Sequence, residues 1–280
     1  QWGTHAPDLV SSTGADQILV TFPGDPASTL AVSWRAPRSA TAGTLRIRKD
    51  GGAWQNVRAF REASAGLAGN RLVAIATDLY PDTLYEYQVM TDGWWGGTPT
   101  RVVRTAPRDA DEAIRFVYLG DVQTGVPEWG RQFSALVSSR PDLRFALLTG
   151  DLVNFGAMST LWDEALAAAG DAFASIPVVP AIGNHETFAG GGALFDAFFV
   201  LPSDGPVAPE RAYVIRYGPL LLAVLDTTDR DRIEVQAQWL DQVLTDSHAI
   251  WKIVAFHHPI WTSVPRRDSA WLRDVLVPVF

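Results

Sequence analysis

The chain has 280 residues, of which 47% are hydrophobic and 19% are charged, and its formal net charge is −8. This length is enough for about two domains with cores of their own. No apolar run reaches the ~18 residues that a membrane-spanning helix needs, and the acidic balance argues against a scaffold that binds nucleic acid through basic patches. Because there is no cysteine, disulfides and thiolate metal ligands are excluded.

The first hundred residues have the pattern of an all-β domain. Short alternating strands are expected at 18–22, 30–34, 44–48 and 84–89, between turns rich in Gly, Pro and Asp. Trp34 is placed like the core tryptophan of a fibronectin type III-like sandwich, and residues 79–87 resemble its tyrosine corner. We therefore predict a β-sandwich over residues 1–106, followed by a polar, proline-containing linker that ends near residue 112.

From residue 113 onward, apolar strands alternate with helices, which favours βαβ units. The pattern predicts an α/β domain over residues 113–280, with two mixed sheets flanked by helices. Strands are expected to end near residues 119, 148, 182 and 257, and a hairpin is expected over 213–226. Helices are expected at 129–139, 159–174, 194–199 and 235–244.

Polar segments follow these strands at the point where each strand ends. They are GDVQ at 120–123, GDLVN at 150–154, GNHE at 183–186 and VAFHHP at 254–259. In open α/β sheets, ligands bind in the crevice beyond the carboxyl ends of the strands. The first three segments are spaced so that one helix fits between each pair of strands. We therefore expect the four segments to converge on one site.

The residue types in these segments suit a pair of metal ions. Asp151 has two carboxylate oxygens and can bridge both ions, and Asp121 would bind one of them. Asn184 and His257 would bind the other. Two divalent ions about 3.5–4 Å apart activate a water molecule and neutralise charge on a transferring phosphoryl group, and their positive charge makes a phosphate substrate compatible with an acidic chain.

His185 and Glu186 follow the asparagine of the GNHE segment and are the catalytic candidates. His185 is within reach of a bound phosphate and is suited to stabilise the transition state or to protonate the leaving alkoxide. Glu186 would fix the orientation of the His185 ring. The predicted reaction is hydrolysis of a phosphate ester by hydroxide that two metals activate, and small-molecule or nucleotide monoesters and diesters are not distinguished by the sequence.

These four segments resemble the motifs of the calcineurin-like metallophosphoesterases, and within them the purple acid phosphatase branch, whose N-terminal β-domain also resembles the first hundred residues. The resemblance implies that Asp121, Asp151, Asn184 and His257 are metal ligands and that His185 contacts the substrate. It implies two divalent or trivalent ions of iron, manganese or zinc, and a secreted or periplasmic protein. His258 is a further candidate for substrate binding, although the HHP sequence needs only its first histidine.

The chain departs from the family pattern at two positions near the metals. Asn154 occupies the place of the tyrosine that ligates ferric iron in the purple enzymes, so tyrosinate charge transfer is not expected. Gln123 occupies the place where many members of the superfamily carry a metal-binding histidine. Its amide oxygen either ligates weakly or forms a hydrogen bond with a bound water molecule, and the sequence leaves both alternatives open.

The final family motif, GHxH, supplies one histidine to each metal and has no counterpart in these 280 residues. We therefore expect the chain to end before that motif, with a further C-terminal segment or a second polypeptide completing the site. The alternative is a binding module on a degenerate phosphoesterase scaffold that has lost catalysis.

Overall fold

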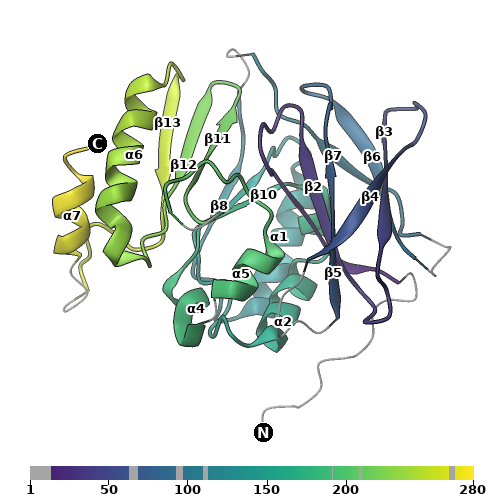
Figure 1. Ribbon diagram of the computed structural model, residues 1–280, viewed down its shortest axis with the longest axis horizontal. Helices are drawn as coiled ribbons and strands as arrows, with labels where there is room; N and C mark the ends of the chain where they lie inside the picture. Colours follow the sequence, from purple (N-terminus) through teal and green to yellow (C-terminus); the bar gives the residue numbers. More distant parts are fainter. Residues whose placement is uncertain are drawn as a thin grey trace, which may run out of the picture.

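The computed structural model describes residues 14–62, 69–92, 97–109, 113–190, 192–207, 210–264 and 269–280. A β-rich N-terminal part lies beside an α/β part that carries the helices (Figure 1). The α/β part contributes strands to a large mixed sheet and forms a small three-stranded sheet. The predicted fold class is therefore confirmed.

Among its described residues, the N-terminal part has seven strands, three more than the sequence pattern predicted. Trp34 is fully buried in its core, where its indole N–H donates to Thr91 Oγ1 at 3.1 Å. The Tyr85 hydroxyl accepts the backbone N–H of Tyr80 at 2.8 Å, which is the kind of contact expected of a tyrosine corner. The strands are β1 (Asp16–Thr21), β2 (Leu30–Ala36), β3 (Gly43–Lys49), β4 (Gln55–Glu62), β5 (Asn70–Ala76), β6 (Leu84–Thr91) and β7 (Arg101–Arg104).

The large sheet has ten strands and runs through both parts of the chain, in the order β7-β6-β3-β4-β5-β2-β1-β10-β9-β8. The connection between the parts is the parallel pairing of β1 with β10, in which Thr21 lies opposite Val178. Side chains reinforce this junction. Arg35 pairs with Asp163 at 3.2 Å, and the Tyr87 hydroxyl donates to the Ala174 carbonyl. One hydrophobic core therefore extends from the β-sandwich into the α/β part.

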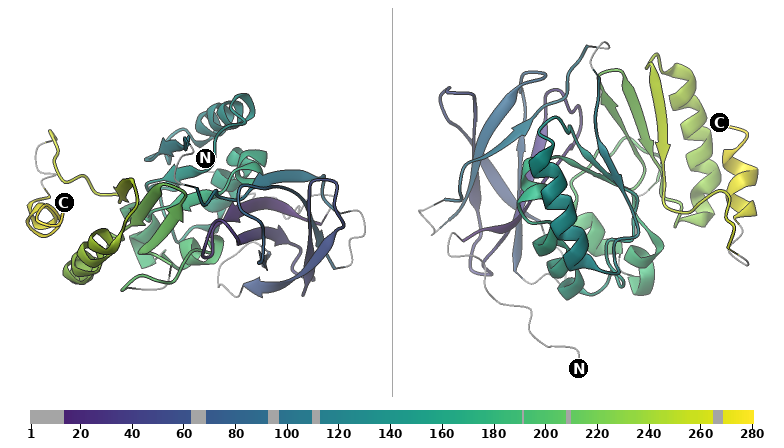
Figure 2. Two further views of the ribbon diagram at one scale, coloured as in Figure 1. Left: turned by 90° about the horizontal axis from the view of Figure 1, so that it is seen from above. Right: turned by 180° about the vertical axis from the view of Figure 1, so that it is seen from behind.

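Three short parallel strands of the large sheet lead to the predicted metal-binding segments. They are β8 (Val117–Leu119), β9 (Ala146–Leu148) and β10 (Val178–Pro180). All three end at the same edge of the sheet because they are parallel. The helices of this region are α1 (Val126–Ser139), α2 (Ser159–Ala169), α3 (Asp171–Ser175), α4 (Asn184–Thr187) and α5 (Gly192–Phe198), and α1 lies across the rear face (Figure 2).

The small sheet brings the histidine segment to the same region. β11 (Tyr213–Tyr217) and β12 (Leu220–Val224) form the predicted hairpin, and β13 (Trp251–Ala255) pairs with β12 in parallel. Apolar side chains of α6 (Ile233–Asp246) and α7 (Ala270–Leu276) form a separate core with this sheet. Among the described residues, no helix combines the length and the apolar character needed to cross a membrane.

Candidate metal centre

The chain turns sharply after β8 and after β9, and each turn places an aspartate at its apex. Asp121 and Asp151 both have left-handed backbones, with φ of 54° and 57°, a conformation that aspartate tolerates better than most residues. The two turns are joined by hydrogen bonds, since Asp121 N–H donates to the Gly150 carbonyl at 3.1 Å and Val122 N–H donates to the Asp151 carbonyl at 3.0 Å. The loops therefore hold one another in place.

Gly150 allows this close packing. Its φ is 88°, and a Cβ at this position would lie 2.7 Å from the backbone of Gly183 and 2.9 Å from the His257 ring. Only glycine combines that backbone conformation with so little space. The three metal-binding segments can meet because no side chain separates them.

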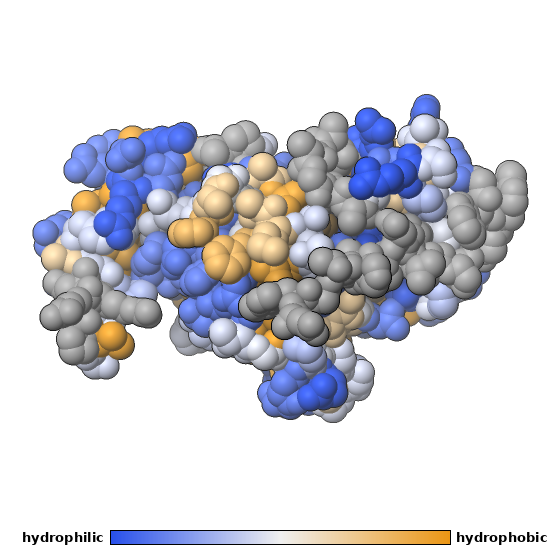
Figure 3. Space-filling model, turned by 90° about the horizontal axis from the view of Figure 1, so that it is seen from below, coloured by the Kyte–Doolittle hydropathy of each residue, from blue (hydrophilic) through white to orange (hydrophobic). Residues whose placement is uncertain are grey.

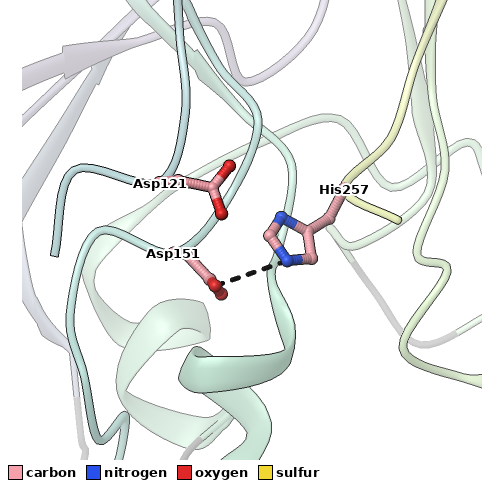
Figure 4. Close-up of side chains that lie close together, drawn as sticks. All are labelled: Asp121, Asp151 and His257. Carbon is pink, nitrogen blue, oxygen red and sulfur yellow. Dashed lines mark ion pairs between the residues drawn. The ribbon is translucent and has the colours of Figure 1, made fainter. Parts of the chain in front are cut away.

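Asp121, Asp151 and His257 form a group whose candidate ligand atoms all lie within 4.8 Å of one another. In Figure 4, the three side chains come from separate loops and converge, with His257 facing Asp151. His257 Nε2 is 3.4 Å from Asp151 Oδ2 and 3.0 Å from Asn184 Oδ1. Because ligand atoms bound at about 2.0–2.2 Å to one ion lie roughly 3–4 Å apart, these side chains need little movement to enclose a cation.

The orientation of the His257 ring also suits a metal ligand. Its Nδ1 lies 2.8 Å from the carbonyl of Thr149, which can only accept a hydrogen bond. Nδ1 therefore carries the proton, and in the neutral ring Nε2 presents its lone pair to Asp151 and Asn184. A carbonyl partner of this kind fixes the tautomer of many metal-binding histidines.

Asp151 and His257 shift one another's pKa in opposite directions. Burial would raise the pKa of Asp151, but the hydrogen bond and positive charge of His257 and the backbone N–H of His185 bring that pKa below its ordinary value. Burial would lower the pKa of His257, but the contacts with Asp151 raise it above its ordinary value. Each group therefore favours the charged form of the other, and metal binding here would require His257 in its neutral form.

Gln123 and Asn154 lie beside this cluster. Gln123 Nε2 donates to Asp151 Oδ2 at 3.2 Å, whereas its Oε1 is buried and has no hydrogen-bond partner among the residues that the structure describes. A buried amide oxygen without a partner suits either a cation or a bound water molecule, so both alternatives from the sequence remain open. Asn154 donates through Nδ2 to the Gln123 carbonyl at 3.1 Å and so braces this loop.

His185 lies beside the cluster, and one of its ring nitrogens contacts a backbone carbonyl. Its Nδ1 is 2.8 Å from the Asn154 carbonyl, and its backbone N–H donates to Asp151 Oδ1 at 3.0 Å. Its Nε2 is 3.8 Å from Asp151 Oδ2, and the side chain is 38% exposed. The second ring nitrogen therefore lies beside the Asp151 carboxylate, and the contact of His185 with a substrate stays a prediction.

Glu186 requires a correction, because the predicted contact with the His185 ring is absent from the hydrogen bonds of the described residues. Its carboxylate accepts backbone N–H groups instead: Oε2 accepts those of Asp151 at 2.7 Å and Gly183 at 2.8 Å, and Oε1 accepts those of Leu152 at 2.7 Å and Val153 at 3.2 Å. The side chain is fully buried. Burial raises the pKa of Glu186, although these N–H groups act against it. The residue organises the loop that carries Asp151.

The sequence did contain a signal for this role of Glu186. Gly183 is the N-cap residue of α4 and Glu186 stands at the third helical position, where a glutamate side chain commonly accepts the N-cap backbone N–H. That part of a capping box was readable in GNHE. The contacts to residues 151–153 were not, because they join segments more than 30 residues apart.

His258 points to a different set of partners. Its Nδ1 is 2.9 Å from Thr227 Oγ1, and its ring lies 6.2 Å from that of Trp271. Burial and the nearby charges of His257 and Arg230 lower the pKa of His258 to about 4, so the ring is neutral at physiological pH. Its role in substrate binding stays a prediction.

Family models match both parts of the chain. Residues 114–277 match the calcineurin-like phosphoesterases, and residues 15–105 match the N-terminal domain of purple acid phosphatases. The chain therefore belongs to the calcineurin-like phosphoesterase family, as the resemblance implied. Within that family, it carries the N-terminal domain of the purple acid phosphatases.

Solved structures share this architecture. Purple acid phosphatase PPD1 from yellow lupin seeds matches with a TM-score of 0.78 and 16% identity, over 95% of this chain and 56% of the lupin chain. PhoD matches with a TM-score of 0.64 and 14% identity, over 88% of this chain and 63% of that chain. The chain thus spans less than two thirds of either protein, and at these identities the likeness concerns the fold. No curated protein matches the sequence.

Proposed function

We propose that this protein hydrolyses phosphate mono- or diesters with a pair of metal ions held at the Asp151 cluster. The observation that carries the proposal is the position of His257 Nε2, 3.0 Å from Asn184 Oδ1 and 3.4 Å from Asp151 Oδ2. These side chains come from three loops far apart in sequence and meet at the His257 ring. One ion would be held by Asp151, Asn184 and His257, and the other by Asp121 and Asp151. The amide oxygen of Gln123 would either bind the second ion directly or form a hydrogen bond with a water molecule bound there.

The chemistry divides between the ions and the protein. Divalent ions held by these residues would lower the pKa of water and offset the negative charge of the phosphoryl group. His185 keeps one ring proton on the Asn154 carbonyl, so in the protonated ring Nε2–H is the group that faces the substrate. That proton would be donated to the leaving oxygen. The buried carboxylate of Glu186 would keep the Asp151 loop rigid while charge develops.

The direct test is hydrolysis of 4-nitrophenyl phosphate and of bis(4-nitrophenyl) phosphate by the purified protein, with its metal content measured in parallel. We expect iron, manganese or zinc to be bound, activity to disappear after chelation, and activity to return when the metal is added back. The relative rates on the two esters would identify the monoester or diester preference. Bound metal without hydrolysis of either ester would instead support the degenerate binding module, and activity that survives complete removal of metal would refute the proposal.

His185→Ala should separate catalysis from metal binding. Because the His185 ring is placed to donate a proton and is not among the proposed ligands, we expect kcat to fall by about 10²–10⁴-fold while metal affinity changes by less than about threefold. His248→Ala, which removes an exposed histidine after α6, is the matched control and should leave both quantities unchanged. A His185→Ala variant that keeps full kcat would show that this ring has no catalytic role.

A further inference from the structure

Two exposed phenylalanines lie together next to His185. Phe155 is 45% exposed and Phe188 is 58% exposed. Their ring centroids are 5.6 Å apart, with an angle of 63° between the ring planes. This is the edge-to-face arrangement that aromatic pairs favour, and here it occurs at the surface.

Both rings belong to residues whose backbone lies close to that of His185, the proposed catalytic histidine. Phe155 lies between Asn154, whose carbonyl contacts His185 Nδ1 at 2.8 Å, and Gly156, whose N–H donates to the His185 carbonyl at 2.9 Å. Phe188 directly follows α4, three residues after His185. One segment that hydrogen-bonds to His185 and another that follows it in the chain therefore each carry one of the two exposed rings.

The surroundings add to this apolar surface. Met158 is 48% exposed, and its N–H donates to the Phe155 carbonyl at 3.0 Å. In the view from below, apolar surface gathers near the middle of the face, in the region where α4 and α5 lie (Figure 3). Single exposed apolar residues are ordinary, but a contiguous group at a functional site marks a surface that binds something.

Building on the function proposed above, we propose that Phe155 and Phe188 form an aromatic platform that binds a planar aromatic ring on the leaving group of the phosphate ester. The metal ions would bind the phosphoryl group. If His185 protonates the leaving oxygen, the organic group attached to that oxygen must extend over the His185 side of the site. Phe155 and Phe188 contribute exposed aromatic surface near His185, and aromatic rings bind planar partners by stacking with little dependence on their identity.

Two pairs of substrates test this proposal, because each pair has nearly the same leaving alkoxide and differs in its aromatic ring. The first pair is adenosine 5′-monophosphate and ribose 5-phosphate, and the second is 2-phenylethyl phosphate and ethyl phosphate. In the wild-type protein, we expect the aromatic member of at least one pair to have a kcat/KM about tenfold higher. A preference in the first pair alone identifies a nucleobase as the ring, and a preference in both identifies any aromatic group.

The variants Phe155→Ala and Phe188→Ala should lower that ratio at least about fivefold. Phe60→Ala is the matched control, because Phe60 is 49% exposed and lies on β4 of the β-sandwich, and it should keep the wild-type ratio. If an alanine variant fails to fold, leucine at the same position keeps apolar volume without a flat ring and should also lower the ratio. If folded variants keep the wild-type ratio of kcat/KM between the aromatic and the non-aromatic ester, the platform is overturned. This also holds if the variants change only the self-association of the protein.

If the protein hydrolyses none of these esters, the proposed function is refuted. The aromatic platform is then tested by a binding measurement. Saturation-transfer NMR with adenosine 5′-monophosphate should then give the strongest signals on the adenine protons, and these signals should weaken in Phe188→Ala. Absence of signal on the adenine protons overturns the platform independently of catalysis.

Discussion

Replacement of Asp151 by asparagine should lower the affinity of the protein for metal by at least about 100-fold and turnover by about 10³-fold or more. Asparagine keeps the size of the side chain but removes the charge and one of the two ligand oxygens that the proposed bridging role requires. The loss should be larger than for any other ligand, because Asp151 alone is assigned to both ions. Calorimetric titration with Mn²⁺ or Zn²⁺ measures the affinity, and 4-nitrophenyl phosphate hydrolysis measures the turnover.

Asp142→Asn is the control for that substitution. Asp142 is an exposed residue that precedes β9, whereas Asp151 follows it, so the same chemical change is made at the opposite end of one strand. Asp142→Asn should leave metal affinity and turnover unchanged, because exposed ion pairs contribute little. If Asp151→Asn bound two metal equivalents with wild-type affinity, the bridging assignment would be wrong.

Glu186→Gln should lower both the free energy of unfolding and the metal affinity. The carboxylate accepts four backbone N–H groups through its two oxygens, and a glutamine has one oxygen and an NH₂ group in their place. Two buried donors would then lose their acceptor, at a cost of about 1–3 kcal/mol each, which gives about 2–6 kcal/mol in total. Metal affinity should fall by about 10–100-fold, because this carboxylate holds the loop that carries Asp151.

Urea denaturation and metal titration measure these two effects. Glu128→Gln makes the same change on an exposed face of α1, where Glu128 contacts Arg131 and Gln132. It should change the free energy of unfolding by less than about 0.5 kcal/mol. If Glu186→Gln were as stable as the wild type, the hydrogen bonds to residues 151–153 would not contribute to loop order in solution.

The elements nearest the proposed site were predictable because their signals are local. The apolar runs before Asp121, Asp151 and Asn184 each ended in a polar turn, and Gly218-Pro219 marked the β11–β12 hairpin. Parallel strands then bring their carboxyl ends together whatever their side chains are. The convergence of the three segments that follow β8, β9 and β10 was therefore predictable from topology.

Features that depend on contacts distant in sequence were not predictable. The left-handed backbones of Asp121 and Asp151 follow from mutual hydrogen bonds between their turns, and nothing within either turn encodes this. The same holds for Glu186, because three of its four backbone N–H donors lie on the loop of residues 151–153. Strands β4 and β5 were also missed, because Gln55–Glu62 and Asn70–Ala76 interrupt their alternation with adjacent apolar or polar residues.

The continuity of the large sheet was a further surprise. The sequence pattern suggested a sandwich packed on a neighbouring domain, whereas β1 pairs directly with β10 and extends one sheet through both parts. Because β10 leads to Asn184, the N-terminal part supports the strand that delivers a proposed metal ligand. This link depends on a strand pairing of few residues, which hydrophobic periodicity does not reveal.

Anomalous diffraction from crystals soaked in Mn²⁺ or Zn²⁺ provides the most direct test of the metal centre. We predict two peaks about 3.5–4 Å apart, with Asp151 oxygens about 2.0–2.2 Å from both ions. One ion should also be bound by Asn184 and His257 and the other by Asp121. Metal peaks at other sites only, with these four side chains free of any ion, would contradict the account.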